Sequence, residues 1–218
     1  MQVSIISSGS HGNAVVVNKN ILIDCGVSFK ALKDVYRDIQ IVLLTHIHSD
    51  HFNKTTLHKL SQERPTLRFA CCDWLVPELL KHEKSNGCKI PQQNIDVLEI
   101  GKIYDYNTFK VSPIKLYHDV PNCGYRVFVN GEKAIYCTDT RTLEGITAKN
   151  YDLYLIESNY EEDEIRERIS KKQMQGQYAY EIAVTGRHLS KEQADAFLLE
   201  NMGANSSYIY LHEHRERI

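Results

Sequence analysis

The chain has 218 residues, of which 42% are hydrophobic and 25% are charged, and this composition predicts one globular domain covering residues 1–218. A chain of this length buries enough surface to hold a core without disulfides or structural metal ions. Its formal net charge of -2 excludes a global basic field that would attract nucleic acid or membranes, so a phosphate-bearing substrate would need a local cationic cluster.

Short strands joined by tight turns are predicted for the first part of the chain. A helix is predicted at 28–37 because Leu32 and Val35 fall on one face, and a second helix is predicted from the residue after His51 to about residue 63. β-Branched and apolar segments, separated by glycine and asparagine, predict strands at residues 3–7, 14–17, 21–24 and 41–45.

The second part of the chain returns to strands and then adds helices. Asn130 and Gly131 predict a hairpin turn between two of the strands. Helices are predicted at 161–173 and 191–200, the latter begun by a capping box of Ser190 and Gln193. Strands are predicted at 67–70, 96–100, 109–117, 125–129, 134–137, 151–157 and 208–211. Two strand-rich halves with outer helices predict one α/β domain of sandwich type.

Free thiols in a cytoplasmic protein are the expectation from the cysteines and the N-terminal segment. The six cysteines form no C-x-x-C pair and no zinc-finger spacing. The first residues lack the charged and apolar regions of a signal peptide, and the longest largely apolar run, 39–44, is far shorter than the ~20 residues that span a bilayer. We therefore expect a reducing compartment and no membrane attachment, and the sequence leaves a homo-oligomer open.

The segment that follows the predicted strand 41–45 carries the chemistry. Four side chains of metal-binding type fall within six residues: His46, His48, Asp50 and His51. Imidazole and carboxylate suit zinc, iron or manganese. In an extended segment His46 and His48 point to one side and can hold one ion, while Asp50 and His51 can reach a second ion. A loop that is rich in histidine by accident is the alternative, and it would bury several unpaired polar groups at high cost.

Further ligands are predicted at other strand ends, because four residues cannot complete two coordination shells. His118 follows the strand 109–117, Asp139 follows 134–137 and can bridge both ions, and His212 follows the last strand. For each of these residues considered alone, the alternative is a structural role in which its polar atoms are satisfied by hydrogen bonds. His214 competes with His212 for the last position. We favour His212 because it lies nearer the strand, and a solvated tail histidine is the alternative for His214.

These ligand-type residues stand in an order that resembles the metallo-β-lactamase superfamily over nearly the whole chain. The resemblance implies an αβ/βα four-layer sandwich, with two mixed sheets, outer helices and the metals at the edge of the facing sheets. It also implies two divalent ions, with Zn²⁺ favoured and Mn²⁺ as the alternative. Asp24 matches the superfamily's first motif, which implies a supporting rather than a ligating carboxylate.

A narrower resemblance is to the YycJ/WalJ-type branch, which is associated with exonuclease activity on DNA. It is carried by Ser-Gly-Ser-His-Gly-Asn at 8–13, Glu-Ser-Asn at 157–159, Gly-Arg-His-Leu-Ser at 186–190 and Leu-His at 211–212. By analogy with nucleases of the superfamily, His188 would contact substrate phosphate or protonate the leaving group, while His212 would complete the second metal. A helix-flanking surface position is the alternative for His188.

Substrate contacts are assigned to further residues at the rim of the predicted site. Ser10 and His11 lie in the glycine-rich turn, where a plain turn residue is the alternative for His11. Arg141 and Arg187 can clamp a phosphate, with solvation at the surface as the alternative for both. Structural roles are assigned to two histidines in predicted helices, His58 and His82.

The predicted reaction is hydrolysis by a hydroxide that bridges two ions about 3.5–4 Å apart. Asp50 would orient this nucleophile and accept its proton, and His188 would act as the acid, so both are predicted catalytic residues. The first interpretation is a phosphodiesterase acting on nucleic acid, an exonuclease on DNA. The alternatives are a phosphodiesterase for a small or cyclic nucleotide, an acyl or thioester hydrolase, and a metal-dependent sensor. An aromatic pocket beside His188 would favour a small nucleotide.

Overall fold

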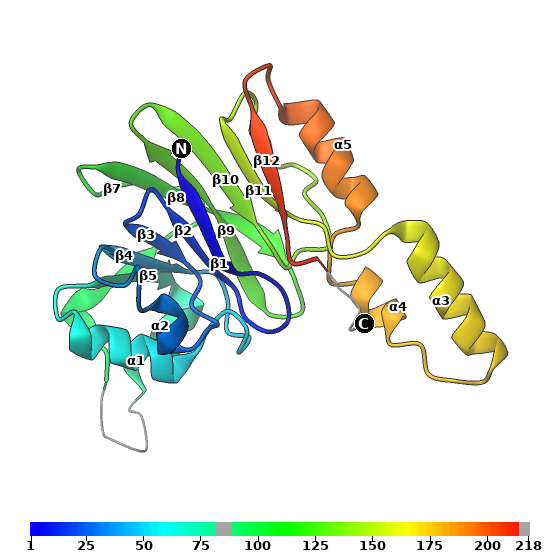
Figure 1. Cartoon of the computed structure of the whole chain (residues 1–218), viewed down its shortest axis with the longest axis horizontal. Coiled ribbons are helices and arrows are strands. Elements are labelled where there is room, and N and C mark those ends of the chain that lie inside the picture. Colours follow the sequence, from blue (N-terminus) through cyan, green and yellow to red (C-terminus); the bar gives the residue numbers. More distant parts are fainter. Residues whose placement is uncertain (82–88, 214–218) are drawn as a thin grey trace.

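Two mixed six-stranded sheets form the centre of the structure (Figure 1). The computed structural model describes residues 1–81 and 89–213. The first sheet follows the chain order β1 (Val3–Ser7), β2 (Ala14–Val17), β3 (Ile21–Ile23), β4 (Ile41–Leu44), β5 (Arg68–Cys72) and β6 (Ile95–Leu98). The second runs from β12 (Ser207–Leu211) through β11 (Leu153–Glu157), β10 (Glu132–Cys137), β9 (Pro121–Val129) and β8 (Phe109–Tyr117) to β7 (Tyr104–Asp105).

Parallel pairing brings several strand ends to one edge of each sheet. In the first sheet β3, β4, β5 and β6 pair in parallel, and in the second β10 pairs in parallel with β11, which pairs in parallel with β12. The remaining neighbours are antiparallel, so both sheets are mixed. Ligand sites in open α/β sheets lie beyond the carboxyl ends of such parallel strands, which directs attention to the residues that follow β4, β10 and β12.

Helices cover the outer faces of the two sheets, which makes four layers. The first sheet packs against η1 (Phe29–Leu32), α1 (Lys54–Glu63) and α2 (Val76–Leu80), and the second against α5 (Lys191–Asn201). Successive residues of one buried strand serve different cores: Leu43 packs between the sheets, whereas Leu44 packs under the helices. This explains why the central strands are apolar throughout. The predicted αβ/βα sandwich is confirmed.

Two helices stand apart from the four layers: α3 (Glu162–Met174) and α4 (Glu181–Thr185) (Figure 1). We call residues 162–185 the helical arm. Ile165 is the buried residue of α3, and Met174 and Tyr178 at the far end of the arm are largely exposed. The charged surface of α3 is that of a solvated helix.

Local signals placed most elements, and one predicted helix is wrong. The hairpin between β9 and β10 turns at Asn130 and Gly131, both with positive φ, and the capping box begins α5. The predicted helix 28–37 is a short 3-10 helix, η1, followed by turns. Leu32 is its buried residue and it receives no side-chain cap, so neither packing nor capping sustains a longer helix.

The structure also contains elements that the sequence did not predict. These are η2 (Asp73–Leu75), α2, η3 (Gln92–Asn94), β7 and α4, each of five residues or fewer. Such lengths are too short to produce a recognisable hydrophobic period. Within residues 1–81 and 89–213, every helix is too short or too polar to cross a lipid bilayer.

Candidate metal centre

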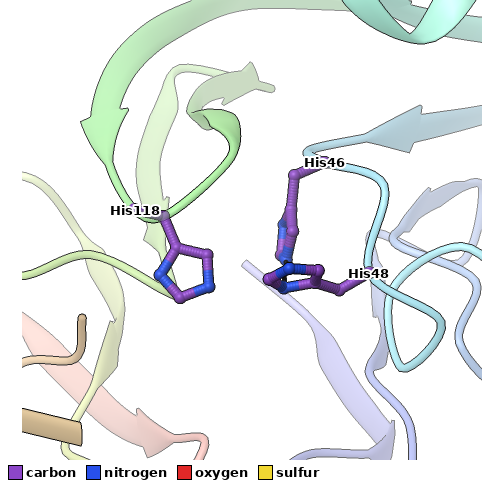
Figure 2. A group of neighbouring side chains, drawn as sticks. All are labelled: His46, His48 and His118. Atoms are coloured by element: carbon purple, nitrogen blue, oxygen red, sulfur yellow. Dashed lines mark hydrogen bonds between the residues drawn. The ribbon is translucent and has the colours of Figure 1, made fainter. Parts of the chain in front are cut away.

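Three histidines form the first group of candidate ligands (Figure 2). His46 and His48 follow β4, and His118 follows β8 from the opposite sheet. One nitrogen from each ring lies within 4.8 Å of the others, and His46 Nε2 is 3.2 Å from His48 Nδ1. Burial and the nearby His51 lower the pKa of His46 well below its usual value, which keeps the imidazole neutral as a metal ligand must be. Three converging imidazoles suit one zinc ion.

Asp50, His51 and His212 form the second group, and Asp139 lies between the two groups. Ligand atoms of Asp50, His51 and His212 also lie within 4.8 Å of one another. Asp139 Oδ2 is 2.8 Å from His51 Nε2, while Asp139 Oδ1 is 3.7 Å from His212 Nε2 and 3.8 Å from His118 Nε2. One carboxylate therefore faces histidines of both groups, which is the arrangement a bridging ligand needs.

The residues fit a pair of cations on two further observations. His212 Nε2 is buried and makes no hydrogen bond to the described residues, and the Asp50 and Asp139 oxygens lie 3.6 and 3.7 Å from it, which is costly unless another group satisfies this nitrogen. Burial alone would lower the pKa of His51, yet Asp139 and Asp24 raise it well above its usual value. An environment that favours a positive imidazolium this strongly also favours a metal cation in the same place.

Left-handed backbone conformations aim three side chains at this centre. Asp24, Asp139 and His212 have φ values of 60°, 57° and 55° and follow β3, β10 and β12 closely. Such conformations cost about 1–3 kcal/mol each for residues other than glycine and persist where the surroundings enforce them. The strain falls on the positions where strand ends must turn their side chains into the site.

Asp24, for which the resemblance implied a supporting role, contacts one of the candidate ligands directly. It is fully buried, and its Oδ2 accepts a hydrogen bond from His51 Nδ1 at 2.7 Å and from the Tyr136 hydroxyl at 3.1 Å. Its Oδ1 accepts from the Thr45 backbone N–H at 3.0 Å. Because Nδ1 of His51 is engaged, Nε2, which faces Asp139 and Asn13 Nδ2, is the nitrogen that would bind a metal.

The glycine-rich turn packs directly beneath the loop that carries Asp50. The Asn13 backbone N–H donates to the Asp50 carbonyl at 2.6 Å, and Asn13 Oδ1 accepts from the Gly9 N–H at 2.8 Å. A Cβ on Gly26 would lie 1.7 Å from the Asp50 carbonyl oxygen, so only glycine fits there. Asn13 and Gly26 thus hold the backbone of the segment that carries Asp50 and His51 in place. The sequence did not assign this role to them.

His188 sits beside the metal groups and is held by Glu157. His188 Nδ1 donates to Glu157 Oε1 at 2.6 Å, and its ring stacks on His212 at 5.2 Å between centroids. Glu157 is fully buried and also accepts from the Thr140 N–H. Burial lowers the pKa of His188, but the hydrogen bond and charge of Glu157 together with the charge of Asp139 raise it above its usual value. Glu157 belongs to the Glu-Ser-Asn motif at 157–159, for which the sequence predicted no role in the site.

Asp119 is a second residue that the sequence did not single out. Its Oδ1 lies 3.4 Å from His48 Nε2 and 3.2 Å from His118 Nε2, and its Oδ2 pairs with Arg187 at 3.2 Å. The Arg187 carbonyl accepts a hydrogen bond from His118 Nδ1 at 3.1 Å. Arg187 therefore stands at the rim of the first group, half-exposed.

The other predicted substrate contacts separate into two places. Ser10 and His11 line a cleft of about 1000 Å³ that also reaches His212, which we call the His212 cleft. Arg141 is exposed, and its guanidinium lies over the Tyr117 ring at 5.9 Å. His58 is buried on α1. His82 and His214 lie outside the described residues, so the choice between His212 and His214 rests on the placement of His212 alone.

The fold and the site together define a four-layer αβ/βα protein with buried histidine and aspartate clusters at the edge of its sheets. Residues 19–207 match the family described as the beta-lactamase superfamily domain. The chain therefore belongs to the metallo-β-lactamase superfamily.

Individual relatives are distant. The chain is 24% identical over 178 residues to exodeoxyribonuclease YycJ of Bacillus anthracis, a match that covers 75% of this chain and 64% of that protein. It thus spans less than two thirds of the curated relative's length. It resembles the metallo-beta-lactamase fold protein YhfI from Bacillus subtilis with a TM-score of 0.73 and 17% identity, over 99% of this chain and 87% of that one. Human tRNase Z, short form, gives a TM-score of 0.64 and 17% identity, over 98% and 92%. These structural likenesses show the fold.

Proposed function

We propose that this protein is a binuclear metal-dependent phosphodiesterase and that DNA is its first candidate substrate, degraded as by an exonuclease. The observation that carries the proposal is the convergence of two ligand groups around Asp139, with His188 held next to them by a buried glutamate. Metal ligands, a carboxylate and an oriented acid in one place are what hydrolysis of a phosphodiester requires. The distant likeness to an exodeoxyribonuclease and to tRNase Z supports a phosphodiester substrate.

The first group would hold one divalent ion and the second group another, with Asp139 reaching both. When bound, the ions would lower the pKa of water toward neutrality and offset the charge that builds on the phosphoryl oxygens. Zinc is favoured by the three imidazoles of the first group, and manganese is the alternative because the second group is richer in carboxylate.

The chain's own residues would position and move the protons. Asp50 is partly exposed, and its Oδ2 lies 3.6 Å from His212 Nε2 and 3.7 Å from His51 Nε2. It can therefore orient an attacking water at the centre and accept its proton. His188 keeps Nδ1 on Glu157, so Nε2 is the atom that would donate a proton to the leaving oxygen. Arg187 at the rim would contact a neighbouring phosphate.

A small nucleotide is the second candidate substrate, because a tyrosine-lined cavity adjoins the His212 cleft. A substrate panel separates the candidates: purified protein is loaded with zinc or manganese, its metal content is measured, and it is offered end-labelled DNA, cyclic nucleotides, bis(p-nitrophenyl) phosphate and a thioester. We expect phosphodiester hydrolysis, with a loss of at least about 100-fold in Asp50→Ala.

The matched control is Asp34→Ala, whose side chain is 84% exposed and lies on the surface after η1. It should keep full activity. Hydrolysis of the thioester alone, or phosphodiester hydrolysis that Asp50→Ala leaves intact at full metal content, would overturn the proposal.

A further inference from the structure

A cavity of about 370 Å³ is lined by residues of α3, of β12 and of the start of α4. The two helices form the helical arm (Figure 1). Tyr160, Tyr180 and Tyr210 line the cavity, together with the apolar Ile165 and Val184. We call it the tyrosine cavity. Its volume falls in the range of small-ligand sites, and walls of aromatic and aliphatic side chains suit a flat aromatic group.

Glu181, in the wall of the tyrosine cavity, has one carboxylate oxygen without a hydrogen bond to the part of the chain that the structure describes. The Glu181 side chain is 4% exposed, and its Oε1 accepts a hydrogen bond from Lys172 at 2.6 Å. Its Oε2 is buried and makes no hydrogen bond to the described residues. Burial would raise the pKa of Glu181, but the Lys172 hydrogen bond, a backbone N–H and the charges of Lys172 and Arg168 together lower it, so the group is an ionised acceptor. An N–H donor on a ligand would remove the penalty of the unpaired oxygen.

The cations in the wall are already paired, which disfavours a phosphate inside the cavity. Lys191 Nζ is 2.9 Å from Glu161, and Arg168 Nη2 is 3.3 Å from Glu164. The Lys172 ammonium lies 4.2 Å from the centroid of the Tyr180 ring and so fixes the ring next to the carboxylate it bonds. The chemistry matches an uncharged aromatic ligand that carries N–H donors.

The tyrosine cavity and the His212 cleft share lining residues. Asn159 lines both the cavity and the His212 cleft, and its Nδ2 lies 3.0 Å from His212 Nδ1. Tyr180 and Tyr210 also line both spaces. A ligand whose phosphate reaches the candidate metal ligand His212 can therefore place an aromatic ring in the cavity.

We propose that the tyrosine cavity is a subsite for a nucleobase of the substrate that carries an N–H donor, with Tyr180 packing on the base and Glu181 Oε2 accepting an N–H from its six-membered ring or amino group. The statement that the base belongs to a substrate rests on the proposed phosphodiesterase function. The binding of the base in the cavity does not, and it can be tested by binding measurements alone. It predicts that the protein prefers nucleotides over phosphodiesters that lack a base.

The test is the affinity of the full-length, zinc-loaded protein for three nucleoside 5′-monophosphates, measured by isothermal titration calorimetry. Guanosine and adenosine monophosphate offer N–H donors, whereas purine riboside monophosphate has the same ring system without them. We expect the two donors to bind about tenfold more tightly than purine riboside monophosphate. In Glu181→Gln, Lys172 can still donate to the amide oxygen, and the amide nitrogen takes the place of Oε2. Because this nitrogen cannot accept a hydrogen bond, the preference for the two N–H donors should vanish.

Tyr180→Leu removes the packing surface and should weaken all three nucleotides by about tenfold. The matched control is Tyr178→Leu, a tyrosine on the same arm that is 84% exposed and outside the cavity wall, and it should bind as the wild type does. Equal affinity for all three nucleotides in the wild-type protein, or equal losses in Tyr178→Leu and Tyr180→Leu, would overturn the subsite.

Failure of the proposed function gives a different result. If bis(p-nitrophenyl) phosphate is not hydrolysed while Glu181→Gln and Tyr180→Leu change nucleotide binding as expected, the base subsite stands and the phosphodiesterase assignment is wrong. If the phosphodiester is hydrolysed and both variants bind all three nucleotides like the wild type, the phosphodiesterase assignment stands and the subsite is wrong.

Discussion

Replacement of Asp24 by asparagine should loosen the second metal group while leaving the first intact. Asn has almost the shape of Asp and tolerates the positive φ of 60° at this position, so the backbone is not strained further. The change removes the negative charge that accepts the 2.7 Å hydrogen bond from His51 Nδ1. Its direct effect is therefore on the orientation and basicity of one candidate ligand.

The magnitude follows from that single hydrogen bond. A hydrogen bond to a charged group contributes about 1.5–3 kcal/mol, and each 1.4 kcal/mol is a factor of ten in affinity. We expect the affinity for one of two ions to fall by about 10–100-fold, the size that such supporting carboxylates typically produce. The group of His46, His48 and His118 should keep its ion.

The assay is a titration with a chromophoric chelator, combined with elemental analysis after dialysis and circular dichroism to check the fold. Wild-type protein should retain two ions per chain and Asp24→Asn one. Asp38→Asn is the control, because Asp38 is exposed on the same half of the molecule. Two ions held by Asp24→Asn with unchanged affinities would refute the supporting role of the carboxylate.

Three further predictions concern pH, packing and metal removal. Burial lowers the pKa of His188, whereas the hydrogen bond and charge of Glu157 and the charge of Asp139 raise it, and the net shift is upward. In Glu157→Gln this pKa should fall; because an acid fails as pH rises through its pKa, the alkaline limb of the kcat profile should move to lower pH, and an unmoved limb would contradict this. Gly26→Ala should destabilise the protein by about 3 kcal/mol in denaturant unfolding, since its Cβ would collide with the Asp50 carbonyl; unchanged stability would count against the close contact. Chelation of the metals should lower Tm by roughly 10 °C, if the ions were present at about 1,000 times their Kd, and a Tm that does not move would argue against a bound pair.

The sequence by itself determined the parts of the site that depend on local order. His46, His48, Asp50 and His51 are neighbours in the chain, so their spacing after an apolar strand was sufficient to predict a metal-binding segment. The Asn-Gly hairpin and the capping box of α5 were equally local, because each depends on a few successive backbone angles and hydrogen bonds. The placement of His118, Asp139 and His212 at strand ends then followed from the strand pattern, and the structure brings them together.

Only the tertiary structure decided which distant groups face one another. Glu157 and His188 are 31 positions apart in the sequence, and Asp119 and Arg187 lie in two different loops. Hydrophobic periodicity in the sequence therefore predicts neither contact. The tyrosine cavity is lined by residues of α3, α4 and β12, which come together only in the folded chain. The predicted helix 28–37 failed for the same reason: whether an apolar stripe becomes a helix depends on what it packs against, and that partner is fixed by the fold rather than by the stripe.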